Sequence, residues 1–367
     1  MSIYIHQLSD WPQFTWDAGK LANLLAAVRH KQGKLAGNMS ALGFNLRSEA
    51  MLNTLTLDIL KSNEIEGEIL NPDQVRSSLA RHLGLEIAGL VPADRHVDGV
   101  VEMMLDATQK YAGPLTADRL FGWHTAMFPA GRSGLHKITI GDWRKGPMQV
   151  VSGAWGKEKV HFEAPEAEKL DMEMQQFLTW FNSPMDIDPV IKAAIAHFWF
   201  VTIHPFDDGN GRIARAIADL QLARADESPQ RFYSMSAQIQ KERKSYYDIL
   251  ENSQKGDLDI SGWIEWFLTC LNNALSATNE ILSTVMYKAQ FWERQSETTL
   301  NARQILMLNK LLDGFIGKLT TSKWAKIAKC SHDTALRDIQ DLVEKSILIK
   351  DDAGGRSTSY VMQNRNS

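Results

Sequence analysis

The chain has 367 residues, of which 44% are hydrophobic and 23% are charged, and its formal net charge is −4. Because one hydrophobic core rarely organises so long a chain, we expect two or three domains of ordinary globular composition. The small negative charge gives the whole chain no electrostatic preference for nucleic acid or for an anionic membrane, although a local basic patch would be compatible with it.

The cysteines and the N-terminal sequence bear on the compartment. Cys270 and Cys330 lie far apart without metal-ligand spacing, which argues against a disulfide framework or a zinc site and favours a reducing environment. The stretch MSIYIHQLSDWPQF has no basic region followed by an apolar one, and no segment approaches the roughly 20 apolar residues of a membrane span. We therefore expect a cytoplasmic protein with no membrane partner.

Helical periodicity dominates the first two-thirds of the chain. Apolar residues recur at i, i+3 or i+4 and i+7 in four stretches, which begin at Leu21, Ser48, Val97 and Glu166. A further helix is expected over residues 272–291. These patterns predict a mainly α fold with an all-α core.

One segment, ITIGDWRKGPMQVVSGAWGKEKVHF, interrupts the helices. Residues 138–140 and 148–151 are short β-type runs flanked by glycine and Pro147. The pattern predicts a β-hairpin that projects from the helices.

Residues 296–367 form a separate unit after the polar joint QSETTLNAR. Helices are expected over residues 302–312, 321–328 and 332–345, with a short turn between the last two. Two strand-like runs follow around Gly354 and Gly355, which is a hairpin signal. Helix-turn-helix followed by a β-hairpin is typical of a winged helix.

Two interpretations of this winged helix stay open. If it binds DNA, Arg356 lies on the wing, and the side chains that face the major groove are His332, Thr334, Arg337 and Asp338. Five aspartates between residues 333 and 352 dilute the basic character, so contact with a protein partner or dimerisation is equally compatible.

The stretch HPFDDGNGRIAR begins at His204 and follows an apolar run over residues 190–203 that is long enough for a buried helix. Pro205 disfavours continuation of that helix, which leaves His204 at its end. Gly209 and Gly211 permit backbone conformations that present successive N–H groups, and a new helix begins there with the positive end of its dipole. The pattern predicts an anion cradle of phosphate size.

The charged residues of this stretch suit nucleotidyl or phosphoryl transfer. A neutral His204 could take a proton from a hydroxyl, Asp208 is a hard oxygen ligand for Mg²⁺ on phosphates, and Arg212 could balance phosphate charge. Arg212 and Arg215 lie on one face of the new helix, where cations oppose the dipole unless an anion is present. Each residue alone could be a cap, a turn former or a surface ion pair, but their coincidence favours a nucleotide site. The chain has no Walker A sequence and no kinase glycine-rich loop.

HPFDDGNGRIAR matches the motif H-x-F-x-[DE]-G-N-G-R-x-x-R, so the chain resembles the Fic family of protein adenylyltransferases. The resemblance implies an all-α core with a β-hairpin flap, and transfer of AMP from ATP to a Ser, Thr or Tyr hydroxyl of a target protein. It also implies the following roles: His204 as general base, Asp208 as Mg²⁺ ligand, Gly209, Asn210 and Gly211 as anion cradle, Arg212 as phosphate clamp, and Phe206 as the anchor of the loop in the core.

The segment GDWRKGPMQVVSG, which begins at Gly141 and ends at Gly153, resembles the family's flap. By this resemblance the flap pairs with the backbone of the target protein, as an added strand does in β-augmentation. Val150, Val151, Ser152 and Gly153 are then expected to lie against the nucleotide.

Two further nucleotide contacts are suggested by the stretch YYDILENSQKGDLDISGWIEWFL, which resembles the segment that closes the family's adenosine pocket. The candidates are Tyr247 and Gln254. The alternative is that they are a core tyrosine and a surface glutamine.

The stretch KSNEIEGE resembles the inhibitory pattern [ST]-x-x-x-E-[GN] of a subgroup of Fic proteins. The matching residues are Ser62, Glu66 and Gly67. By this resemblance Glu66 pairs with Arg215, takes the place of the terminal phosphate of ATP and holds the enzyme inactive. The neighbouring Glu64 and Glu68 fall outside the pattern and are expected to be solvated surface.

The resemblance divides the chain into a helical N-terminal domain with the inhibitory helix (1–90), a Fic catalytic core (91–292) and a C-terminal winged helix-turn-helix (296–367). We therefore expect a self-inhibited protein adenylyltransferase that also modifies itself, and a homodimer is compatible with its interaction-capable end domains. Three alternatives stay open: removal of AMP, transfer of another phosphate-containing group, and a transcription regulator whose Fic core senses a ligand.

Overall fold

The computed structural model describes residues 4–40, 44–87, 89–153, 159–184, 186–313, 315, 317–351 and 358–363. The chain divides into a larger compact unit, of residues 1–85 and 91–281, and a smaller one, of residues 86–90 and 282–367. The sequence-based division into three domains stays a prediction. In the described part of the chain, no helix is both long enough and apolar enough to cross a membrane.

The larger unit is mainly helical, which confirms the predicted fold class. Its elements in chain order are η1 Ile5–Gln7, α1 Ala18–Ser40, α2 Phe44–Ile65, α3 Pro72–His82, α4 Arg95–Gln109, α5 Ala117–Met127, β1 Arg132–Ser133, β2 His136–Lys137, β3 Gln149–Ser152, β4 Lys159–Glu163, η2 Ala167–Lys169, α6 Leu170–Asn182, α7 Pro189–Ile203, α8 Asn210–Ala225, α9 Met235–Lys241, α10 Arg243–Gln254 and the first part of α11 Ser261–Arg294.

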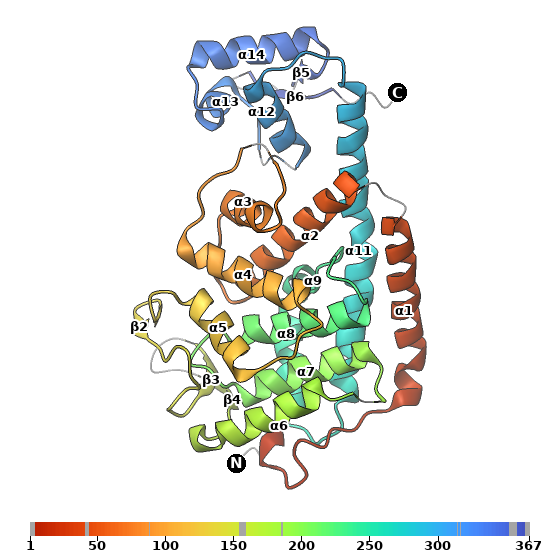
Figure 1. Cartoon of the computed structure of the whole chain (residues 1–367), viewed down its shortest axis with the longest axis vertical. Helices are drawn as coiled ribbons and strands as arrows, with labels where there is room; N and C mark the ends of the chain where they lie inside the picture. The colour runs from red at the N-terminus through yellow and green to blue at the C-terminus, as the bar shows by residue number, and fades with distance from the viewer. Residues whose placement is uncertain are drawn as a thin grey trace. The chain divides into compact units, whose positions relative to one another are not determined.

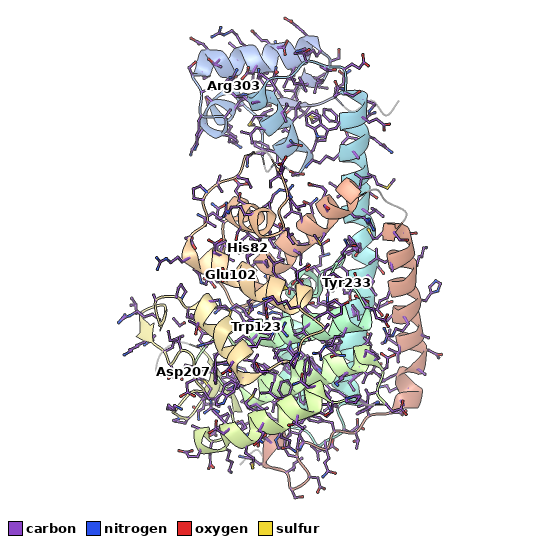
Figure 2. All side chains as sticks on the ribbon, viewed as in Figure 1. His82, Glu102, Trp123, Asp207, Tyr233 and Arg303 are labelled. Atoms are coloured by element: carbon purple, nitrogen blue, oxygen red, sulfur yellow. The ribbon has the colours of Figure 1, made fainter. Side chains whose placement is uncertain are left out.

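The core of the larger unit is built around α7 and α8, which lie side by side (Figure 1). Helix α7 begins after Asp188, whose carboxylate accepts a hydrogen bond from the Val190 amide at 2.8 Å. Pro189 stands in the first turn, where its missing N–H costs nothing. Every residue of α7 from Val190 to Ile203 is buried. Trp123 and Tyr233, both labelled in Figure 2, are also buried in this unit.

The hairpin pairs different segments from those predicted. Strand β3 pairs with β4 in antiparallel register, with Val150 opposite Phe162, whereas residues 138–140 form no strand. The backbone of that predicted strand is held elsewhere: the Thr139 amide donates to the Asp207 carboxylate at 2.8 Å, and the Ile138 amide donates to Gly131 O. The signal for the true partner strand was the run KVHFE.

The smaller unit contains the last part of α11, α12 Ala302–Leu312, α13 Thr321–Ile327, α14 His332–Glu344 and the antiparallel strands β5 Leu348–Lys350 and β6 Tyr360–Met362. Its apolar core includes Met307, Leu308, Trp324, Ile339 and Leu342. These elements match the predicted order, and the winged-helix assignment itself stays a prediction.

The prediction that Asp338 faces DNA is wrong. Asp338 is buried, because its carboxylate accepts hydrogen bonds from Arg303 at 2.7 and 2.9 Å and from the Asn301 amide at 2.9 Å. His332 and Arg337 are exposed and Thr334 is half-buried. The predicted wing residues Gly354, Gly355 and Arg356 lie outside the described residues.

Candidate active site

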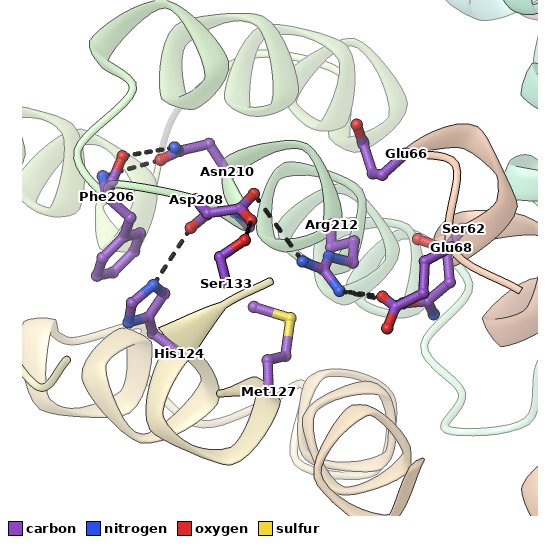
Figure 3. A network of polar contacts seen from close by, with 12 residues as sticks. Ser62, Glu66, Glu68, His124, Met127, Ser133, Phe206, Asp208, Asn210 and Arg212 are labelled. Carbon is purple, nitrogen blue, oxygen red and sulfur yellow. Dashed lines mark hydrogen bonds and ion pairs between the residues drawn. The ribbon is translucent and has the colours of Figure 1, made fainter. Parts of the chain in front are cut away.

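The loop between α7 and α8 is fixed at both of its ends. The Phe206 ring is fully buried and stacks on the His124 ring, with centroids 4.3 Å apart. The side chain of Asn210 accepts a hydrogen bond from the Phe206 amide at 2.9 Å and donates one to the Phe206 carbonyl at 2.8 Å (Figure 3). Phe206 is therefore the buried anchor that the sequence suggested, and Asn210 ties it to the start of α8.

His204 caps the C-terminal end of α7 in the left-handed conformation, with φ of +52°. Its Nδ1 lies 3.1 Å from the Val201 carbonyl, so the neutral ring that donates there leaves Nε2 as a proton acceptor. Burial lowers the pKa of His204 to about 4. The ring is thus uncharged at neutral pH, as a general base must be.

Arg144 positions the backbone of His204, and sequence reasoning missed it. Its guanidinium is buried and donates to the carbonyls of His204 at 2.9 Å, Gly146 at 2.7 Å and Pro165 at 2.5 Å. Its own amide donates to Pro205 O at 2.9 Å. Nothing in the run DWRKGP distinguishes this arginine from a surface one.

Asp208 stands at the N-terminal end of α8 with its carboxylate 43% exposed. One carboxylate oxygen accepts from the Gly209 amide at 2.5 Å, and the other accepts from the hydroxyl of Ser133 (Figure 3). His124 Nε2 lies 3.2 Å from the Asp208 carbonyl. Ser133 and His124 are further site neighbours that the sequence did not indicate.

Both arginines of the motif are buried in the first turns of α8. Arg215 is 2% exposed and donates to the Ser62 hydroxyl at 2.9 Å, to the Ser62 carbonyl at 2.8 Å and to Glu66 Oε1 at 2.8 Å. Arg212 is 5% exposed and donates to Glu68 Oε2 at 2.7 Å and to Asn63 Oδ1 at 3.2 Å. Among the described residues, Arg215 Nη1 and Arg212 Nε have no hydrogen-bond partner.

The expectation that Glu68 is solvated surface is therefore wrong. Its carboxylate pairs with Arg212, and a second contact joins Glu68 Oε1 to His96 Nε2 at 2.5 Å. Glu64 instead forms a half-exposed pair with Lys61. The periodicity of α2 gave no signal for this difference, because the helix ends at Ile65.

Gly211 leaves room for Glu66 to approach α8 closely. A Cβ atom at Gly211 would lie 2.2 Å from Glu66 Oε1, which is closer than any real contact. The Glu66 carboxylate thus lies against the backbone of the first turn, at the positive end of the helix. Gly209, the remaining cradle glycine, is the residue before α8 and has φ of +82°.

Tyr247 and Gln254 lie in different surroundings. The Tyr247 hydroxyl is 3.3 Å from Glu66 Oε2 and 3.4 Å from the Ile65 carbonyl, and burial raises its pKa to about 12. Gln254 is buried and donates to the Thr202 hydroxyl at 3.2 Å, so the alternative of a surface glutamine is wrong. Tyr247 therefore contacts Glu66, whereas no contact links Gln254 to Glu66 among the described residues.

The flap residues Val151, Ser152 and Gly153 are exposed, and Val150 is half-buried. The Ser152 hydroxyl lies 2.5 Å from His161 Nε2 on β4, and His161 Nδ1 lies 2.5 Å from a carboxylate oxygen of Glu251 on α10. This chain of contacts fastens the strand pair to a helix of the core.

The left-handed histidine cap, the glycine-containing helix start and the two buried guanidinium groups thus lie in and around one loop of a mainly helical protein. Residues 114–222 match the family model described as Fic/DOC family, and residues 4–85 match a domain of unknown function, DUF4172. The motif that begins at His204 lies within the residues that match the Fic/DOC family model, so the resemblance stated from the motif is confirmed.

Two curated relatives carry the name protein adenylyltransferase Fic. The protein from Aedes aegypti is 35% identical over 243 residues, which cover 63% of this chain and 44% of that protein. The protein from Nematostella vectensis is 34% identical over 240 residues, which cover 62% and 49%. The chain thus spans less than half the length of these relatives.

Two solved structures share the fold. A Fic family protein from Desulfovibrio desulfuricans G20 has 21% identity and a TM-score of 0.53, with 97% of this chain and 99% of that chain covered. A Fic domain containing signaling protein from Bacteroides thetaiotaomicron has 20% identity and a TM-score of 0.51, with 72% and 96% covered.

Proposed function

We propose that the protein is an adenylyltransferase that transfers AMP from ATP to a Ser, Thr or Tyr hydroxyl of a protein. The observation that carries the proposal is the pair of buried guanidinium groups beside a neutral His204, each with an N–H that has no partner among the described residues. A buried donor left unsatisfied costs about 1–3 kcal/mol, and more when it is charged, so the site is suited to an anion. The names of the curated relatives support adenylyl transfer.

The chemistry follows from the groups around the loop. His204 Nε2 takes the proton of the target hydroxyl, and the hydroxyl oxygen forms a bond to the α-phosphorus of ATP. The bond from that phosphorus to the bridging oxygen of the β-phosphate breaks, and pyrophosphate leaves. Arg212, Arg215 and the amides at the start of α8 balance the negative charge on the phosphates.

Asp208 fits the role of Mg²⁺ ligand. Magnesium at nucleotide sites is usually held by one or two carboxylates together with phosphate oxygens, and Asp208 offers one half-exposed carboxylate beside the arginines. In the described part of the chain, no group of three or more His, Cys, Asp or Glu side chains could hold a metal ion by itself. Phosphate oxygens of the nucleotide would therefore complete the coordination of Mg²⁺ at Asp208. When bound, Mg²⁺ would neutralise charge on the phosphates.

Glu66 supports a self-inhibited form of this enzyme. Its carboxylate lies on Arg215, and Ser62 holds the same guanidinium through its hydroxyl and its carbonyl. In the proposed inhibition this internal anion competes with the terminal phosphate of ATP. The exposed strand β3, within the segment from Gly141 to Gly153, is the proposed docking edge for the target protein.

The test uses Glu66→Gly protein with labelled ATP and Mg²⁺. Self-labelling is expected, and His204→Ala in the same background is expected to abolish it because the base is lost. Absence of label from the Glu66→Gly protein, with ATP binding intact, would refute adenylyl transfer.

A further inference from the structure

Glu68 makes a contact that the inhibitory pattern does not include. Its Oε2 lies 2.7 Å from Nη1 of Arg212, the arginine assigned to clamp phosphate, whereas Glu66 pairs with Arg215. Both buried guanidinium groups at the start of α8 thus hold a carboxylate, and the two carboxylates come from one short turn.

The turn that follows α2 delivers both side chains. The amides of Glu66 and Glu68 both donate to the Asn63 carbonyl at 3.0 Å, and Gly67 between them has φ of +84°. Left-handed backbone of this kind favours glycine. The backbone therefore fixes the two carboxylates on the same side, one for each arginine.

Burial and charge favour a displaceable contact over a permanent one. The Arg212 side chain is 5% exposed and cannot give up its proton, so it needs an anion or other acceptors nearby. The Glu68 side chain is 36% exposed and can reach solvent. Asn63 Oδ1 lies 3.2 Å from the same Arg212 nitrogen and stays as an acceptor when the carboxylate leaves.

His96 on α4 offers Glu68 an alternative partner. His96 Nδ1 is held by the Met127 carbonyl at 2.8 Å, which directs Nε2 toward Glu68. The contact with His96 holds the pKa of Glu68 below its ordinary value, so the carboxylate is ionised. A carboxylate released from Arg212 thus has a cation-forming side chain beside it.

We infer that Glu68 is a second internal anion, which occupies Arg212 and must be displaced before a nucleotide phosphate can bind there. The inference rests on the proposed function, because it assigns phosphate to Arg212. Glu66 occupies Arg215, whereas Glu68 occupies Arg212. Removal of Glu66 alone therefore leaves Arg212 occupied by an internal carboxylate.

The test compares two glutamates of one segment, Glu68 and Glu64, in the full chain. The background is Glu66→Gly with His204→Ala, in which no turnover is expected. ATP affinity with Mg²⁺ is measured by calorimetry for Glu68→Gln and for the matched control Glu64→Gln, whose side chain contacts Lys61 and Gln240. Because the neutral glutamine no longer competes with phosphate for Arg212, we expect Glu68→Gln to tighten ATP binding about tenfold, which corresponds to about 1.4 kcal/mol. Glu64→Gln should change it less than about twofold.

Adenosine, which has no phosphate, is the ligand control. The gain from Glu68→Gln should vanish with adenosine, and a gain of equal size would overturn the inference because it would not depend on phosphate. Unchanged or weaker ATP binding by Glu68→Gln, with an unchanged melting temperature, would also overturn it and make Glu68 a positioning residue for Arg212. If ATP binds but Glu66→Gly labels nothing, the proposed transfer fails and the assignment of Glu68 stands.

Discussion

Replacing Arg144 by alanine should destabilise the larger unit and disable His204 together. The guanidinium is 1% exposed and makes three hydrogen bonds to carbonyls at 2.5–2.9 Å. At about 1.5 kcal/mol for each bond from a charged donor, the sum is about 4–5 kcal/mol. Alanine does not incur the cost of removing a charged guanidinium from water, which offsets part of this sum. We therefore expect the free energy of unfolding to fall by about 3 kcal/mol.

Urea unfolding of the full chain, followed by tryptophan fluorescence, measures this loss. Lys145→Ala is the matched control, because the neighbouring Lys145 side chain is 69% exposed and pairs only with Asp142 among the described residues. Its effect should stay within about 0.5 kcal/mol. At a urea concentration where Arg144→Ala stays folded, its self-labelling in the Glu66→Gly background should also fall at least about tenfold, since a shift of the His204 backbone misplaces the base. An Arg144→Ala protein as stable as Lys145→Ala would refute the assignment of these hydrogen bonds.

Four further outcomes are expected. Because the pKa of His204 is lowered to about 4, kcat/KM of the Glu66→Gly enzyme should not fall between about pH 7 and 5.5, whereas a histidine near the ordinary 6.5 would lose most of its activity there. Ser133→Ala removes the hydroxyl that orients Asp208 and should raise the Mg²⁺ concentration for half-maximal labelling by about threefold to tenfold, as outer-shell partners of metal ligands do. His161→Ala releases β4 from Glu251 and should lower the rate with a target protein without changing ATP affinity; an equal change in both would contradict a role limited to the flap. Burial alone would raise the pKa of Asp338, but hydrogen bonds from Arg303 and Asn301 lower it below the ordinary value. The ionised carboxylate therefore stabilises the smaller unit at a pH above the unfolded pKa of about 3.9, and this stability is lost as the pH falls through the folded pKa. Acid titration followed by near-UV circular dichroism can detect the loss.

The sequence predicted the parts of the site that depend on local geometry. Pro205 follows a long apolar run, where its missing N–H prevents the helix from continuing. A glycine pair at the start of a helical pattern opens backbone amides, so the loop from His204 and the start of α8 could be predicted from one stretch. Helix boundaries in the smaller unit were predictable for the same reason, since the caps Asn301, Thr320 and Ser331 precede clear apolar periodicity.

The parts that the sequence missed depend on contacts between distant segments. Arg144, Ser133 and Glu68 have the residue types of an ordinary surface, and only the fold brings them to His204, Asp208 and Arg212. The strand error has a similar cause. Residues 138–140 have high β-propensity, yet the backbone there bonds to Asp207 in the motif loop, a partner that no local pattern encodes.

The short segment from Ser62 to Glu68 contacts both arginines of the anion site but contributes no group to the proposed chemistry. In the proposed mechanism, inhibition and catalysis therefore depend on separate segments of the sequence, and a substitution in one leaves the other intact. The same mechanism implies that substitutions at Glu66 or Glu68 raise the resting activity of the enzyme without any change in HPFDDGNGRIAR. The level of regulation would then evolve through this turn, independently of the residues proposed for the chemistry.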